Sequence, residues 1–187
     1  MPKHTRAQRT AQRSTQTASL RTSCTLIDPL STAPVYFHRE HTPPYGFLSQ
    51  WFPSPFHDPA VDITYNCAEQ RMMHHKALLC NDIASATAIL ASREPGEQKT
   101  LGRSVKGWKE YAKEWERIKY EIVEEGNWLK FTRATEHAEW LRESLLGTGE
   151  RELVEASGSD RVWGIGFSEN VADGMRAEWG QNLLGRR

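Results

Sequence analysis

The chain has 187 residues, of which 38% are hydrophobic and seven are Trp, and this composition predicts one globular domain with a sizeable core. Lys plus Arg equals Asp plus Glu at 24 each, so the net charge provides no general attraction to nucleic acid or to an anionic membrane. No stretch approaches the roughly 18 apolar residues of a membrane span. The three Cys form no CxxC pair, which favours a soluble protein of a reducing compartment such as the cytoplasm.

The N-terminal segment differs in composition from the rest of the chain. It is rich in Ser, Thr and Gln with almost no large apolar residues, so burial cannot offset the entropy of ordering it. We therefore predict a disordered basic tail over residues 1–33 and a single domain over residues 34–187. A mitochondrial transit peptide has a similar composition and is one alternative to a cytoplasmic location, as is the nucleus. Before Asp28 the basic residues are Lys3, Arg6, Arg9, Arg13 and Arg21, with no acid.

The sequence of the first half of the domain predicts two short strands followed by two helices. Residues 35–65 are dense in aromatics and prolines, which excludes a long helix and favours strands at 35–37 and 63–65. Asn66 is a good N-cap with Glu69 three positions later, so a helix is predicted to start near Cys67. Asp82 predicts the start of a second helix, "IASATAILAS", which Pro95-Gly96 ends; "GEQKTLGRSVKG" then predicts a loop.

The second half predicts further helices and two more strands. Apolar residues at spacings of three and four from Trp108 indicate a long amphipathic helix that stops at Gly126. Asn127 is predicted to cap a short helix, and "EHAEWLRESLLGTG" predicts another that ends at Gly147. "RELVEAS" and "RVWGIGF" are short and β-prone, which favours strands. The fold class is therefore α+β, predominantly helical, with a few short strands.

Common cofactor and metal motifs are absent from the sequence. His74 and His75 are adjacent, so they point in different helical directions and do not form the HExxH motif of zinc proteases. "GIGFSE" lacks the third glycine of a dinucleotide fingerprint, and no GxxxxGK[ST] motif exists. The sequence therefore implies no metal and no cofactor.

A stripe of mixed chemistry lies on the helix predicted after Asn66. Steps of four and three lead from Glu69 to Met73 and Lys76, so a carboxylate, a thioether and an amine share one helical face. A surface cap with a solvated lysine explains the pattern as well as a functional pair does. The segment alone leaves both interpretations open.

Seven segments in the same order resemble the NADAR superfamily, also called the YbiA-like family. "AEQRMMHHKA" is similar to the family signature E-x-x-M-M-x-x-K-A, and the resemblance covers about residues 35–185. Gln50 stands where members often have Asn, and members usually continue past "NLLG" with a further helix. The other segments are "YGFLSQWFPSPF", "KTLGR", "WLKF", "LLGTGERELVEAS", "DRVWGIG" and "WGQNLLG".

The resemblance implies a YbiA-like domain that hydrolyses an N-glycosidic bond. The implied partner is a nucleotide-like small molecule carrying ADP-ribose, such as ADP-ribosylated guanine, an ADP-ribosylated base in nucleic acid, or a ribosylaminopyrimidine phosphate of the riboflavin pathway; no membrane partner is implied. Cleaving the ribose C1′–N bond develops positive charge at C1′, which a carboxylate such as Glu69 or Asp160 stabilises. Lys76 offers a second route, because a desolvated neutral amine can form a Schiff base with the opened sugar.

The substrate-binding residues are assigned with a structural alternative for each. Arg103 suits bidentate phosphate binding or is a solvated loop charge. Trp163 can stack on a base, with Gly164 and Gly166 allowing close backbone approach, or be a buried structural residue. Asp160 is also a good turn residue. The remaining candidates, which either line the pocket or pack and pair structurally, are Ser49, Trp51, Phe56 and Glu155.

Two other functions compete with the hydrolase. One is a catalytically silent module that binds ADP-ribose or NAD in the same pocket; the shorter C-terminus favours it, whereas the presence of both Glu69 and Lys76 favours the enzyme. The other is a helical interaction protein whose basic tail contacts nucleic-acid phosphates, against which the neutral body argues.

Overall fold

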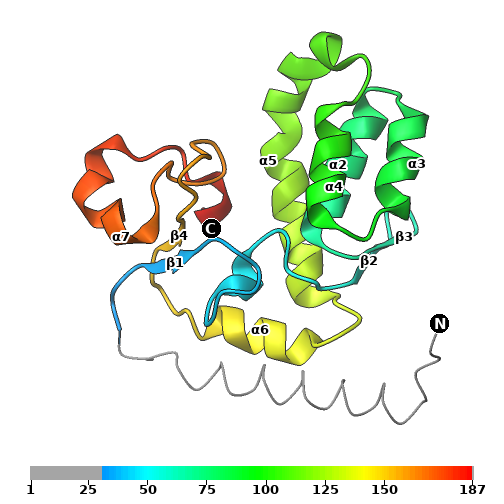
Figure 1. Cartoon of the computed structure of the whole chain (residues 1–187). Helices are drawn as coiled ribbons and strands as arrows, with labels where there is room; N and C mark the ends of the chain where they lie inside the picture. Colours follow the sequence, from blue (N-terminus) through cyan, green and yellow to red (C-terminus); the bar gives the residue numbers. More distant parts are fainter. Residues whose placement is uncertain (1–30, 187) are drawn as a thin grey trace, which may run out of the picture.

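A computed structural model describes residues 31–186, and within them the fold is α+β and mostly helical, as the sequence predicts (Figure 1). Residues 1–30, which make up most of the predicted basic tail, lie outside the described part. The strands are β1 (Val35–Phe37), β2 (Phe56–Asp58), β3 (Ile63–Tyr65) and β4 (Leu153–Glu155). The helices are α2 (Ala68–Leu79), α3 (Ile83–Ala91), α4 (Pro95–Arg103), α5 (Trp108–Thr132), α6 (Ala138–Leu146) and α7 (Glu169–Ala172), with short 3-10 turns η1 (Gly46–Leu48), η2 (Asp173–Glu178) and η3 (Leu183–Gly185).

Helices α2 to α5 form one packed group, seen on the right of Figure 1. Helix α2 lies at its centre and contacts α3, α4 and α5, and its two neighbouring methionines are both buried. The apolar spacing from Trp108 that predicted a helix turns the Trp115 and Val123 side chains into the same core. This core includes Met72, Met73, Ala77, Ile89, Trp115 and Val123.

Two small sheets place the remaining segments around this group. Strand β1 pairs in parallel with β4, and β2 pairs antiparallel with β3. Helix α6 covers the β1 side through Leu141, which packs with Val35, Phe37 and Phe47. The strands predicted at 35–37 and 63–65, the Asp82 N-cap and the helix that ends at Gly147 are all confirmed.

The start of α2 differs by one residue from the prediction. Cys67 rather than Asn66 is the N-cap. The Gln70 side chain accepts the Asn66 backbone N–H at 2.8 Å, so Gln70, and not Glu69, bonds back to the start of the helix. The Glu69 carboxyl is thereby left for another role.

The predicted loop after Pro95 is instead helix α4, and this prediction was wrong. Proline is favoured in the first turn of a helix because its missing N–H has no partner there. Here Pro95 begins α4 rather than ending α3, which stops at Ala91. Gly102 is tolerated within α4 because it gives room for α2: a Cβ at Gly102 would lie 2.1 Å from the Met73 sulfur.

Two further predictions were also wrong, namely the helix end at Gly126 and the strand over 161–167. Helix α5 runs through Gly126 and Asn127 to Thr132, so the short separate helix predicted after Asn127 is its last part. A single glycine costs a helix only about 1 kcal/mol, which the packing of so long a helix outweighs. The predicted strand over 161–167 is irregular. Its carbonyls instead accept hydrogen bonds from the C-terminal segment, as in Leu183 N–H to Val162 O at 3.1 Å and Leu184 N–H to Trp163 O at 3.0 Å.

A buried ion cluster ties α2 to β2 and α5. Arg71 is 1% exposed and donates to the equally buried Asp58 at 2.7 Å, to the Ile122 carbonyl and to the Glu125 carboxylate. Asp58 keeps a lowered pKa: burial acts to raise it, but the hydrogen bonds from Arg71 and the Ala60 N–H prevail. Because both charges are out of water, the pairing locks the register of these elements.

Candidate active site

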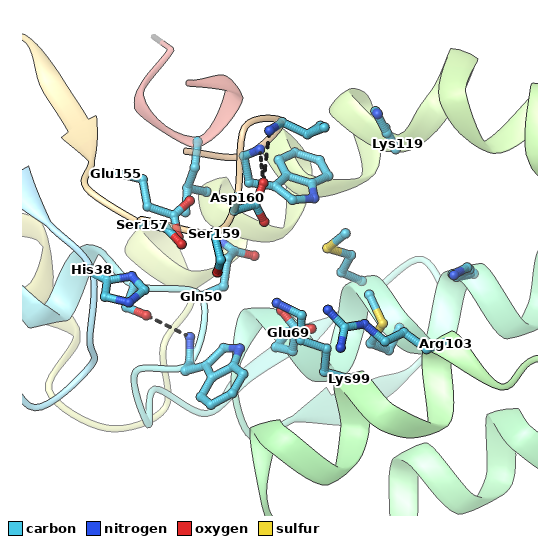
Figure 2. Close-up of a pocket in the computed structure, with 18 of the residues that line it drawn as sticks. His38, Gln50, Glu69, Lys99, Arg103, Lys119, Glu155, Ser157, Ser159 and Asp160 are labelled. Carbon is cyan, nitrogen blue, oxygen red and sulfur yellow. Dashed lines mark hydrogen bonds between the residues drawn. The ribbon is translucent and has the colours of Figure 1, made fainter. Parts of the chain in front are cut away.

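A cavity of about 510 Å³ opens between the helical group and the segments around β1 and β4 (Figure 2). One wall is formed by α2, α4 and α5, and the other by the segments at 38–40, 49–51 and 155–163. Because these segments are far apart in sequence, the cavity exists only in the folded chain. Eight of the eleven predicted site residues line it: Ser49, Trp51, Glu69, Lys76, Arg103, Glu155, Asp160 and Trp163.

The other three predicted residues do not line the cavity. Phe56 is fully buried and packs on Tyr65 in a separate apolar cluster. Gly164 lies against β4, where a Cβ would approach the Glu155 carbonyl to 2.6 Å, and Gly166 adopts a φ of 80° beside Arg161. The two glycines are therefore needed for backbone packing rather than for contact with a ligand.

Glu69, in the first turn of α2, is the most buried acid of the cavity at 5% exposure. Burial raises the pKa of Glu69 to about 7, although Lys99, a hydrogen bond from the Trp51 indole and Arg103 all act to lower it. Its backbone N–H donates to the Gln50 carbonyl at 3.1 Å, which joins α2 to the opposite loop. Glu69 can therefore change protonation state near neutral pH.

Glu155 and Asp160 face this group from the opposite wall (Figure 2). Burial, then the neighbouring Asp160 and Glu69, raise the pKa of Glu155 to about 7, while Lys99 opposes the rise. The Glu155 Oε2 is buried and receives no hydrogen bond from the described residues. Asp160 has the predicted turn role, because its Oδ1 accepts from the Val162 and Trp163 N–H groups at 2.9 and 2.8 Å.

Lys76 shares the cavity with Glu69, as the helical stripe predicted, but its amine rests on an aromatic ring. The Lys76 Nζ lies 3.8 Å from the Trp108 ring centroid and 5.9 Å from that of Trp115. Burial lowers the pKa of Lys76, whereas Cys80 and Glu69 act to raise it. The ring face also favours the ammonium form, since cation–π attraction requires the charge.

Cations and tryptophans are paired around the cavity. Lys99 and Arg103 lie one turn apart on α4, and the Lys99 Nζ is 5.8 Å from the Trp51 ring centroid. On α5, the Lys119 Nζ is 5.9 Å from the Trp163 ring centroid and binds Glu116. Such an arrangement suits a ligand that has both phosphates and a flat base.

Several lining residues were not identified from the sequence. The segment that holds Lys99 was predicted to be a loop, so its helical spacing of four from Arg103 gave no signal. Lys119 lies at helical spacing from Trp115 on α5, and that spacing is the signal that could have found it. The main residues missed are His38, Arg39, Gln50, Lys119, Ser157 and Ser159.

A second cavity, of about 560 Å³, adjoins the first and shares Glu40 with it. None of the described residues that line it is a Lys or Arg, so it offers no comparable phosphate site. Its lining is mainly apolar, with Pro43, Pro44, Phe47, Phe52, Pro53, Pro55 and Trp140.

A sequence model of the NADAR domain matches residues 36–187. The chain belongs to the NADAR family. It is 38% identical over 159 residues to an N-glycosidase of Acanthamoeba polyphaga mimivirus, a match that covers 81% of this chain and 90% of that protein. It is 32% identical over 135 residues to an N-glycosidase of Nostoc punctiforme, covering 72% and 81% of the two chains.

The solved structure of the E. coli protein YbiA has the same fold. It superposes with a TM-score of 0.64 at 21% sequence identity, covering 87% of this chain and 84% of that one. The predicted single YbiA-like domain is thus confirmed. Within residues 31–186 no helix is long and apolar enough to cross a membrane, and no group of three or more His, Cys, Asp or Glu is arranged to hold a metal ion.

Proposed function

We propose that this NADAR protein is an N-glycoside hydrolase whose substrate carries ADP-ribose, or a related ribosyl phosphate, on a base nitrogen. The two N-glycosidase relatives support the reaction class. The substrate is inferred from the cavity, and one observation carries the proposal. Two glutamates whose surroundings raise their pKa to about 7, the buried Glu69 and the partly buried Glu155, share the cavity with the cations Lys99 and Arg103.

The two glutamates are suited to opposite halves of the reaction. Each charge disfavours ionisation of the other, so near pH 7 the pair holds about one proton. Lys99 favours and Asp160 disfavours the ionised form of both glutamates, whereas Arg103 and the Trp51 indole favour ionisation of Glu69 alone. Glu69 is therefore assigned as the carboxylate and Glu155 as the acid.

The chemical step then balances with water as the second reactant. As the C1′–N bond breaks, Glu155 donates its proton to the leaving nitrogen, and the Glu69 carboxylate stabilises positive charge at C1′. The water oxygen bonds to C1′ and a water proton passes to Glu69. The pair ends with one proton, as it began.

The helix α4 cations provide the phosphate contacts in this proposal. Lys99 and Arg103 are at i and i+4, so their side chains project to the same face. Arg103 can bind a phosphate bidentately, and Lys99 serves as a point charge beside it. Trp51 and Trp163 supply ring faces for the sugar or the base.

A Schiff-base route through Lys76 is the alternative mechanism at the same site. It requires a neutral amine that leaves the Trp108 ring, where the ammonium is favoured. Borohydride added during turnover distinguishes the routes. We expect no ribosylated adduct on Lys76 by mass spectrometry, and a trapped adduct would establish the covalent route instead.

The function is tested by assaying the purified protein on ADP-ribosyl-guanosine and on a ribosylaminouracil phosphate side by side. We expect release of the base from the first substrate, with Glu69→Gln as the inactive control. Turnover of only the second would redirect the proposal to ribosyl monophosphates. Tight binding of ADP-ribose without turnover of either would identify a silent binding module and refute the hydrolase.

A further inference from the structure

Lys130, on the last turns of α5, is completely buried at 0% exposure and does not line the cavity. Lysine is almost never fully buried unless it is paired, yet no carboxylate within residues 31–186 forms an ion pair with it. Its Nζ donates to the backbone carbonyl of Ser49 at 2.9 Å. The rest of its surroundings is apolar, with the ring centroids of Phe131 and Phe52 at 5.0 and 5.8 Å from the Nζ.

The carbonyl that Lys130 binds belongs to residues 49–51, a segment that makes hydrogen bonds to Glu69. Within this segment, the Gln50 carbonyl accepts the Glu69 N–H, and the Trp51 indole N–H hydrogen-bonds the Glu69 carboxylate. Asn127, one turn before Lys130 on α5, accepts a hydrogen bond from the Gln50 side chain at 2.7 Å. Helix α5 therefore holds the segment at two adjacent residues, and the segment in turn contacts Glu69 through both its backbone and its side chain.

We propose that Lys130 is a positioning residue for Glu69, acting through Ser49 and the 49–51 segment. Without Lys130 the Ser49 carbonyl keeps only the local Phe52 N–H donor at 3.1 Å, so the segment loses its Lys130 tie to α5 and with it a contact that holds the Trp51 indole against the Glu69 carboxylate. The catalytic consequence depends on the proposed function. The electrostatic consequence for Glu69 does not.

The contact does not depend on the charge of Lys130. Burial lowers the pKa of Lys130 to about 7, with only the Cys67 thiol acting in the opposite direction. A neutral amine retains two N–H groups, so it still donates to the Ser49 carbonyl above that pH. Lys130 therefore holds the segment across the neutral range rather than switching it.

The test is an NMR titration of the Glu69 carboxyl carbon in the full chain, which needs no substrate. Lys130→Met keeps the apolar stem and removes the donor, and relief of the buried charge favours its folding. Trp51→Phe removes only the indole N–H. Each variant removes the hydrogen bond from the Trp51 indole to the Glu69 carboxylate, Trp51→Phe directly and Lys130→Met by releasing the 49–51 segment. We therefore expect either variant to raise the pKa of Glu69 by about one unit.

The double variant Lys130→Met/Trp51→Phe is expected to raise it no further than Trp51→Phe alone, because both changes remove the same hydrogen bond. The other groups that face Glu69, namely Lys99, Arg103, Asp160 and Glu155, are unchanged in all variants. Lys113→Met, an exposed lysine on the same helix, is the matched control and should leave the titration unchanged.

An unchanged Glu69 titration in Lys130→Met would overturn the proposal, as would additive effects in the double variant. Lys130→Leu is the second donor-free variant if the Met variant does not fold, and the same outcomes apply to it. Under the proposed function, kcat should also fall about tenfold, the equivalent of the weakened hydrogen bond. Because the titration involves no substrate, an inactive enzyme with the expected pKa shifts would refute the hydrolase and leave the positioning role intact.

Discussion

Replacing Glu69 by Gln is expected to make the protein more stable above pH 7 while abolishing hydrolysis. Glu69 is 5% exposed, and burial raises its pKa from 4.5 to about 7. Gln has the same shape and can still accept the Trp51 hydrogen bond, but it carries no charge. The substitution therefore isolates the cost of holding a buried carboxylate.

The magnitude follows from linkage between proton binding and folding. Between pH 4.5 and 7 the folded protein binds a proton at Glu69 that the unfolded chain releases, so wild-type stability falls as pH rises through that window. The difference of about 2.5 in pKa corresponds to about 3 kcal/mol. The Gln variant lacks this loss. Relative to wild type it should gain about 3 kcal/mol between pH 4 and pH 8, or roughly 6 to 12 °C in Tm for a domain of this size.

The assay is urea unfolding of both proteins at pH 4, 6 and 8, with the free energy of unfolding compared at each pH. Glu155 enlarges the effect, because removing the Glu69 charge also lowers the pKa of Glu155 in the folded protein and so reduces a second loss of stability at high pH. If the difference between variant and wild type does not change with pH, the pKa of Glu69 is not raised by folding, because Glu69 then ionises in the folded protein as readily as in the unfolded chain.

Substitutions at three further positions test separate parts of the structure. Asp160→Asn preserves an oxygen for the turn and should keep the fold but reduce kcat, whereas Asp160→Ala should also lower Tm; equal Tm values would deny the turn role. Arg71→Leu leaves Asp58 buried without its partner and should cost about 3–5 kcal/mol in urea unfolding, so a loss below about 1 kcal/mol would contradict the buried pairing. Arg103→Gln should raise KM at least tenfold for phosphorylated substrates with kcat little changed, and an equal effect on a substrate without phosphate would exclude phosphate binding.

The parts of the fold that local patterns determine could be predicted from the sequence. The Asp82 cap and the apolar spacing from Trp108 located two helices, because side-chain capping and a helical stripe need only neighbouring residues. Glycines misled the prediction where tertiary contact overrode propensity. Gly102 lies within a helix because Met73 packs where its Cβ would be, and Gly126 continues α5 because packing along the helix outweighs the cost of one glycine.

The site could be predicted in part for the same reason. Glu69 and Lys76 share one helix, so their common face follows from spacing alone. Glu155 faces Glu69 across the cavity because β4 pairs with β1, which is distant in sequence. No local sequence pattern specifies this pairing. The cation–π contact of Lys76 with Trp108 and the burial of Lys130 also depend on contacts between distant segments.

The joint use of Glu69 and Glu155 can be seen in a structure of Glu69→Gln in complex with uncleaved ADP-ribosyl-guanosine. We expect the anomeric carbon to lie between the side chain at position 69 and Glu155, with the diphosphate at Lys99 and Arg103. A ribose bound in the second cavity beside Phe52 and Trp140, or a sugar turned away from both carboxyl positions, would contradict this expectation.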